Sequence, residues 1–137
     1  MYKHPYLRAY LAGIAIPTAF LLAVMTAYTI DRYARNIAIP IERVIVFPMA
    51  AVPNAWGLWN VIYVAFLQKR HVSLGLFGGA LPLLLVPGGY LITRLLNFTI
   101  PEFVFRAAPF ALPTALIVYY LVWKYFVSFL NTELGIA

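Results

Sequence analysis

Four long apolar stretches, separated by short polar segments, make up nearly the whole of this 137-residue chain. They cover residues 7–30, 44–67, 72–96 and 107–130, and their charged residues lie only at the margins. A helix needs about 20 residues to cross a hydrocarbon core of about 30 Å, so each stretch is long enough for one span. The pattern therefore predicts an all-α integral membrane protein. Residues 1–137 form one domain, a bundle of four transmembrane helices.

The polar connections are short, so we expect consecutive helices to be antiparallel neighbours in an up-down topology, with both termini on one side. The Lys and Arg residues divide evenly between the two sides, so the positive-inside rule does not orient the chain. All the lysines lie on the side of the termini, whereas Asp31, Glu42 and Glu102 lie on the other. This asymmetry favours cytoplasmic termini and location in a cell (inner) membrane.

Composition narrows the function classes. Hydrophobic residues make up 64% of the chain and charged residues 10%, against about 25% charged in a typical soluble domain. The absence of cysteine excludes disulfides and thiolate catalysis. The two histidines are too few for a three-ligand metal site, and no serine has a base and an orienting group beside it. We therefore predict no catalytic residue, no metal, no cofactor and no nucleic-acid partner, with the lipid bilayer as the surrounding medium.

Each span contains a proline in a similar short context, and these prolines are hinge candidates: Pro17, Pro53, Pro82 and Pro113. Proline lacks the backbone N–H and displaces the carbonyl four residues earlier, which in lipid needs another partner. Two interpretations stay open. The prolines are moving hinges that offer carbonyl oxygens to a substrate, or they are static kinks, which are the commoner outcome.

The second span has the most unusual content, Pro-Asn-Ala-Trp-Gly-Leu-Trp-Asn over residues 53–60. On a helical wheel Asn54, Gly57 and Asn60 share one broad face, and Trp56 and Trp59 lie opposite. We expect the small polar face to point inward. Its asparagines would then serve as interhelical hydrogen-bonding groups or line a polar path. The tryptophans would face lipid, a partner protein or an aromatic ligand.

Two further groups have a defined chemistry. Gly75 and Gly79 have the spacing of a close helix-packing face, within the chain or between copies. Arg32, Arg35 and Arg43 lie near one another on the side opposite the termini. Arginine binds phosphate through two-point contacts, so an anionic lipid headgroup is one candidate ligand. Pairing with the nearby carboxylates is the alternative.

Three functions remain for a chain of this kind. The first is a non-catalytic subunit or oligomeric scaffold, whose glycine, asparagine and tryptophan faces contact other membrane subunits or copies of itself. The second is a small oligomeric carrier or channel with a polar path lined by Asn54 and Asn60. The third is a protein that binds or handles anionic lipid through its arginines.

Overall fold

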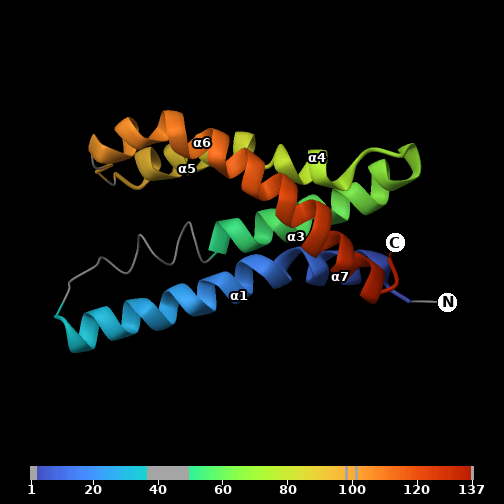
Figure 1. Ribbon diagram of the computed structural model, residues 1–137, viewed down its shortest axis with the longest axis horizontal. Coiled ribbons are helices and arrows are strands. Elements are labelled where there is room, and N and C mark those ends of the chain that lie inside the picture. Colours follow the sequence, from blue (N-terminus) through green and yellow to red (C-terminus); the bar gives the residue numbers. More distant parts are fainter. Residues whose placement is uncertain (1–2, 37–49, 98, 101, 137) are drawn as a thin grey trace.

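The computed structural model describes residues 3–36, 50–97, 99–100 and 102–136 (Figure 1). All the regular structure in these ranges is helical, and no strand occurs in them. The prediction of an all-α chain is therefore confirmed for the described residues. The helices are α1 (Pro5–Ala34), α3 (Val52–Ile62), α4 (Leu74–Gly79), α5 (Pro82–Leu95), α6 (Glu102–Val122) and α7 (Ser128–Glu133).

Within the described residues, three helical stretches are long and apolar enough to cross a membrane: Pro5–Ala34, Leu74–Leu95 and Glu102–Glu133. The last of these joins α6 to α7 through a π-helical segment, Trp123–Val127. Of the expected second span, residues 44–49 lie outside the described part. Helix α3 continues through π-helical and 3₁₀ turns to Arg70.

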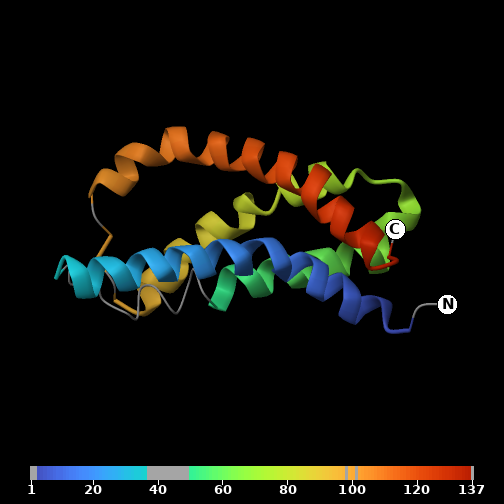
Figure 2. The same cartoon turned by 60° about the horizontal axis from the view of Figure 1, so that its bottom comes forward.

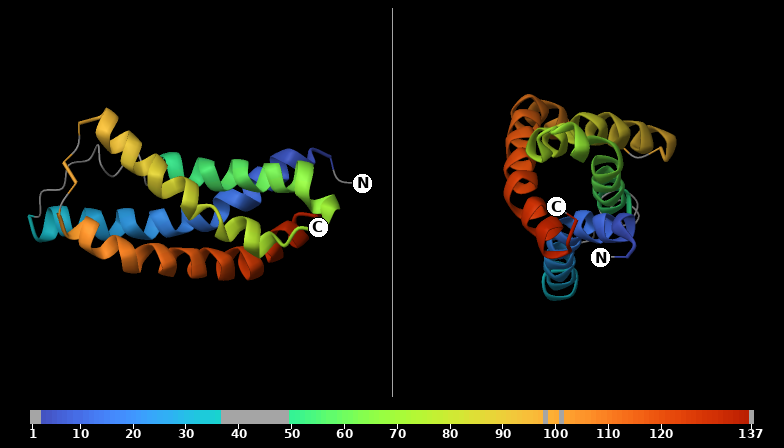
Figure 3. Two further views of the ribbon diagram at one scale, coloured as in Figure 1. Left: turned by 90° about the horizontal axis from the view of Figure 1, so that it is seen from above. Right: turned by 90° about the vertical axis from the view of Figure 1, so that its right-hand side faces the viewer.

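The helices run along one long axis. Both ends of the described chain lie at one end of the molecule, together with the turn after Arg70 (Figure 1). The end of α1 and the connection between α5 and α6 lie at the opposite end. Viewed along the axis, α1, α3, α4–α5 and α6 follow one another around the bundle (Figure 3, right). This order is the one expected from short connections between consecutive antiparallel helices.

Local residue chemistry explains where several helices end. Asn36, His71 and Asn97 follow the ends of helical segments and have φ values of 55°, 57° and 55°. Asparagine tolerates this left-handed conformation better than most residues because its short polar side chain hydrogen-bonds locally. At the start of α4 the Ser73 hydroxyl accepts a hydrogen bond from the Leu76 N–H, an ordinary N-cap.

The four prolines do not all interrupt a helix. Pro17 and Pro113 lie inside the unbroken helices α1 and α6, and Pro53 lies in the first turn of α3. Only Pro82 coincides with a break, since α4 ends at Gly79 and α5 begins at Pro82 (Figure 2). There the Leu81 N–H bonds to the Gly78 carbonyl at 3.1 Å, a tighter turn than an α-helix makes.

The core lies between α3, the α4–α5 break and the π-helical segment after α6. It consists of Trp56, Leu81, Trp123 and Val127. Large apolar side chains cover the outside, for example Phe20 (67% exposed), Leu95 (72%) and Phe110 (77%). Most of the apolar surface therefore faces outward, the reverse of a water-soluble domain.

Candidate functional site

The most completely buried polar group is a pair of asparagines. Asn60 and Asn131 exchange amide hydrogen bonds of 2.8 Å and 3.1 Å, and Asn60 also donates to the Ala9 carbonyl at 2.7 Å. Asn60 is 0% exposed and Asn131 is 1% exposed. One contact thus ties α1, α3 and α7 together. In the sequence, Asn131 lies at the end of an apolar stretch. Its role follows from its contact with Asn60, 71 residues earlier, which the sequence alone does not show.

Asn54 also bonds to α1 but is less buried than Asn60. It is exposed, accepts a hydrogen bond from the Tyr10 hydroxyl and donates one to the Ala50 carbonyl at 2.9 Å. The bond to Tyr10 makes Asn54 an interhelical hydrogen-bonding group between α3 and α1. Asn54 and Asn60 both bond to α1, Asn54 through the Tyr10 hydroxyl and Asn60 through the Ala9 carbonyl, and the two asparagines differ in exposure.

Gly57 lies at the closest approach of α1 and α3. A Cβ at Gly57 would come within 2.5 Å of the Tyr10 ring, and one at Gly13 would lie 2.6 Å from the Trp56 carbonyl oxygen and 2.8 Å from the Gly57 Cα. Neither helix has room for a side chain at this crossing. Gly13 was not apparent from the sequence, because it has no second glycine four residues away.

Helix α4 presents its glycines to the helical stretch Glu102–Glu133. A Cβ at Gly75 would lie 3.0 Å from both Lys124 and Tyr120, and one at Gly79 would lie 3.2 Å from Tyr120. The tightest position is Gly78, where a Cβ would come within 1.9 Å of the Trp123 ring. These glycines all pack within the chain.

Both tryptophans of α3 also pack within the chain, which corrects the expectation that they face lipid or a partner. The Trp56 ring contacts those of Tyr119 and Trp123, with centroids 4.9 Å and 5.3 Å away. Trp59 stacks on Phe77 with centroids 4.5 Å apart and an interplanar angle of 6°. Helix α6 with the segment after it, and helix α4, approach α3 on this side, which a wheel of α3 alone does not reveal.

Arg32 and Arg35, the two described residues of the predicted arginine group, bond within α1. The Arg32 guanidinium donates to the Tyr28 hydroxyl at 2.8 Å, one turn earlier in α1. Arg35 pairs with Asp31 at 3.4 Å, and both are at the end of α1. Arg43 lies outside the described residues. The two arginines that are described are therefore engaged on their own helix.

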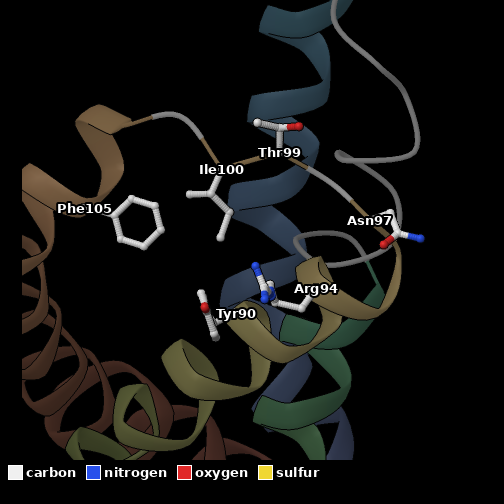
Figure 4. A pocket seen from close by; sticks show the side chains of 6 residues that line it. All are labelled: Tyr90, Arg94, Asn97, Thr99, Ile100 and Phe105. Atoms are coloured by element: carbon white, nitrogen blue, oxygen red, sulfur yellow. The ribbon is translucent and has the colours of Figure 1, made fainter.

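A cavity of about 540 Å³ lies at the end of the molecule away from the termini, between α5 and the start of α6 (Figure 4). It is lined by Tyr90, Arg94, Asn97, Thr99, Ile100 and Phe105. Arg94 sits in the last turn of α5, and the left-handed Asn97 turns the chain across the helix end. The sequence did not single out these residues, because the end of α5 and the start of α6 come together only through the turn between the two helices.

The cavity combines two kinds of surface. Arg94, Tyr90, Asn97 and Thr99 offer a guanidinium, a phenol, an amide and a hydroxyl. Ile100 and Phe105 are apolar. The two ion pairs of the described residues, Asp31–Arg35 and Glu102–Arg106, leave Arg94 without a carboxylate partner. A phosphate-bearing amphiphile matches both surfaces.

The described residues contain no group of three or more His, Asp or Glu side chains that would hold a metal ion. No protein-family model matches this chain, and no curated protein or solved structure is significantly similar to it. The function is therefore argued from the geometry alone.

Proposed function

We propose that this chain is a four-span membrane protein with up-down topology that binds an anionic lipid in the cavity around Arg94 and catalyses no reaction. The apolar exterior and the three long apolar helices support the membrane placement. We take α3 and the residues before it as the remaining span. Cytoplasmic termini are part of the proposal, supported by the distribution of lysines and carboxylates along the chain.

The observation that carries the proposal is the position of Arg94 in a cavity that also has an apolar wall. In the four-span arrangement this end of α5 lies at the headgroup layer, where lipid phosphates are found. A guanidinium binds phosphate through two parallel hydrogen bonds, and Tyr90, Asn97 and Thr99 supply further polar contacts. Ile100 and Phe105 then lie where the first methylenes of the acyl chains would run.

The other two functions have less support. The scaffold hypothesis started from packing faces, and the glycine and tryptophan faces are filled within this chain. The carrier hypothesis needs Asn54 and Asn60 on one path, but Asn54 is exposed and Asn60 is enclosed. One observation keeps a membrane subunit as the second candidate. Helix α6 has no buried residue, so its outer face is free for lipid or for a helix of another subunit.

The test compares two arginines at the same end of the molecule. The purified full chain in detergent micelles is titrated with phosphatidylglycerol and phosphatidylcholine, and bound lipid is counted by native mass spectrometry. Arg94→Gln should weaken phosphatidylglycerol binding about tenfold, which corresponds to about 1.4 kcal/mol. Arg106→Gln is the matched control, because Arg106 is exposed, already pairs with Glu102 at 2.7 Å and does not line the cavity.

An equal loss in both variants, or none in Arg94→Gln, would overturn lipid binding at this cavity. The same spectra test the second candidate. A foreign subunit or a defined number of copies, retained after mild extraction, would support the subunit function instead.

A further inference from the structure

A second cavity, of about 420 Å³, lies at the end of the molecule that carries the termini. Its walls are the first two turns of α1 and the end of α7. Lys3, His4, Arg8 and Glu133 supply its polar groups. It therefore differs from the Arg94 cavity in having both a carboxylate and several basic groups.

The chain holds the two walls in place. His4 has a left-handed φ of 60°, and Pro5 starts α1 directly after it, so the N-terminal residues turn away from the helix axis. The Arg8 guanidinium donates to the Leu134 carbonyl at 3.0 Å, from one wall to the other. Gln68 donates to the Ile136 carbonyl at 2.8 Å and fixes the residues after α7.

Two side chains of opposite charge in this cavity, Lys3 and Glu133, do not pair with each other. Lys3 and Glu133 are both exposed, and neither takes part in the ion pairs of the described residues. An ammonium and a carboxylate on the lining of one cavity, more than 4 Å apart, leave room for a ligand that carries both signs of charge. Leu7 and Leu11 line the same cavity and are 58% and 46% exposed, so the ligand also needs an apolar part.

We propose that this cavity binds a zwitterionic phospholipid whose headgroup carries a primary ammonium, as phosphatidylethanolamine does. The proposal shares with the proposed function only the placement of the chain in a membrane. The lipid ammonium donates hydrogen bonds to the Glu133 carboxylate, and Lys3 and His4 donate to the phosphate. The acyl chains run along Leu7 and Leu11 toward the bilayer centre.

The lining favours ethanolamine over choline. A quaternary ammonium has no N–H to donate and is held in proteins by cages of aromatic rings. The described lining includes no Phe, Tyr or Trp. A primary ammonium makes charge-assisted hydrogen bonds to a carboxylate, which are about twice as strong as neutral ones.

The experiment again uses the full chain in detergent micelles and native mass spectrometry, with ethanolamine, choline and glycerol phospholipids of identical acyl chains. Glu133→Gln should weaken phosphatidylethanolamine binding about tenfold and leave phosphatidylglycerol binding unchanged. Glu102→Gln is the matched control, since Glu102 is an exposed carboxylate at the opposite end of the molecule. Unchanged phosphatidylethanolamine binding in Glu133→Gln, or an equal loss in Glu102→Gln, would overturn the proposal.

Two further arms separate the alternatives. Glycerophosphoethanolamine, which has the headgroup without acyl chains, should compete at least a hundredfold more weakly than the lipid. Equal competition would mean that the ligand is a soluble zwitterion and would overturn the lipid assignment. Arg94→Gln should leave phosphatidylethanolamine binding intact, so this site and the anionic-lipid site succeed or fail independently.

Discussion

The indole N–H of Trp59 donates a hydrogen bond of 2.7 Å to the backbone carbonyl of Phe77, the residue on whose ring Trp59 stacks. In a regular helix the Phe77 carbonyl would accept from the Leu81 N–H. Before Pro82 that N–H bonds to Gly78 instead, and Phe77 keeps only a 3.3 Å contact from Ala80. The α3 tryptophan therefore compensates for the proline break in the neighbouring span.

Replacing Trp59 by Phe should destabilise the protein by about 1–2 kcal/mol, because an inner carbonyl loses its best donor while an aromatic ring is kept. The measurement is thermal or denaturant unfolding in detergent micelles. The cost should shrink in a Pro82→Ala background, where the helix can close its own hydrogen bonds. Equal costs in both backgrounds would show that Trp59 acts through ring packing alone.

A methyl group at Gly13 should destabilise the protein even though alanine favours helix by about 1 kcal/mol. The new Cβ would meet the Trp56 carbonyl oxygen and the Gly57 Cα, and backbone atoms at a helix crossing cannot move aside cheaply. We expect Gly13→Ala to lower the unfolding free energy by about 1–3 kcal/mol. Gly88→Ala is the matched control in another helix.

Gly88 has nothing within 4 Å of its Cβ position, so its substitution should be neutral or stabilising. If Gly13→Ala and Gly88→Ala behave alike, α1 and α3 are not in close contact at this crossing.

Much of the fold was predictable because it depends on local pattern. The length and hydropathy of residues 7–30, 72–96 and 107–130 predicted the helical stretches Pro5–Ala34, Leu74–Leu95 and Glu102–Glu133. Helix propensity does not reveal which face meets which neighbour. Trp56 packs on α6 and the segment after it, and Trp59 packs on α4, contacts that the pattern of α3 alone does not show. Gly13 is important only because it lies opposite Gly57.

The candidate sites were less predictable for the same reason. Arg32 and Arg35 are close in sequence, but each bonds to a different residue one helical turn earlier in α1. Arg32 bonds to Tyr28, and Arg35 pairs with Asp31. Arg94 lines a cavity because the chain turns at Asn97, and Glu133 and Lys3 line one cavity only because α7 lies beside the start of α1. These sites depend on contacts between segments that are far apart in the sequence. One sequence by itself does not specify which distant segments come into contact.

Removing one partner of the buried asparagine pair should destabilise the protein by about 1–3 kcal/mol and loosen the C-terminal helix. In Asn131→Ala the Asn60 amide keeps its bond to Ala9 but loses both bonds to α7. Hydrogen exchange should then rise selectively over Ser128–Glu133. The control is Thr132→Ala, an exposed neighbour whose hydroxyl bonds only to the Ser128 carbonyl at 3.0 Å. Uniform protection in Asn131→Ala would mean that apolar packing alone holds α7.

The proposed four-span topology predicts which positions share a side of the membrane. The chain contains no cysteine, so single cysteines introduced at Asn36, His71, Asn97 and Thr132 can each be labelled without a background. All four positions are exposed. With a membrane-impermeant maleimide on intact cells, Asn36→Cys and Asn97→Cys should label, and His71→Cys and Thr132→Cys should label only after permeabilisation. If α3 and the residues before it did not cross, positions 36, 71 and 132 would share one side and position 97 would lie alone on the other. If all four assignments were reversed, the four spans would stand and the termini would lie outside the cytoplasm.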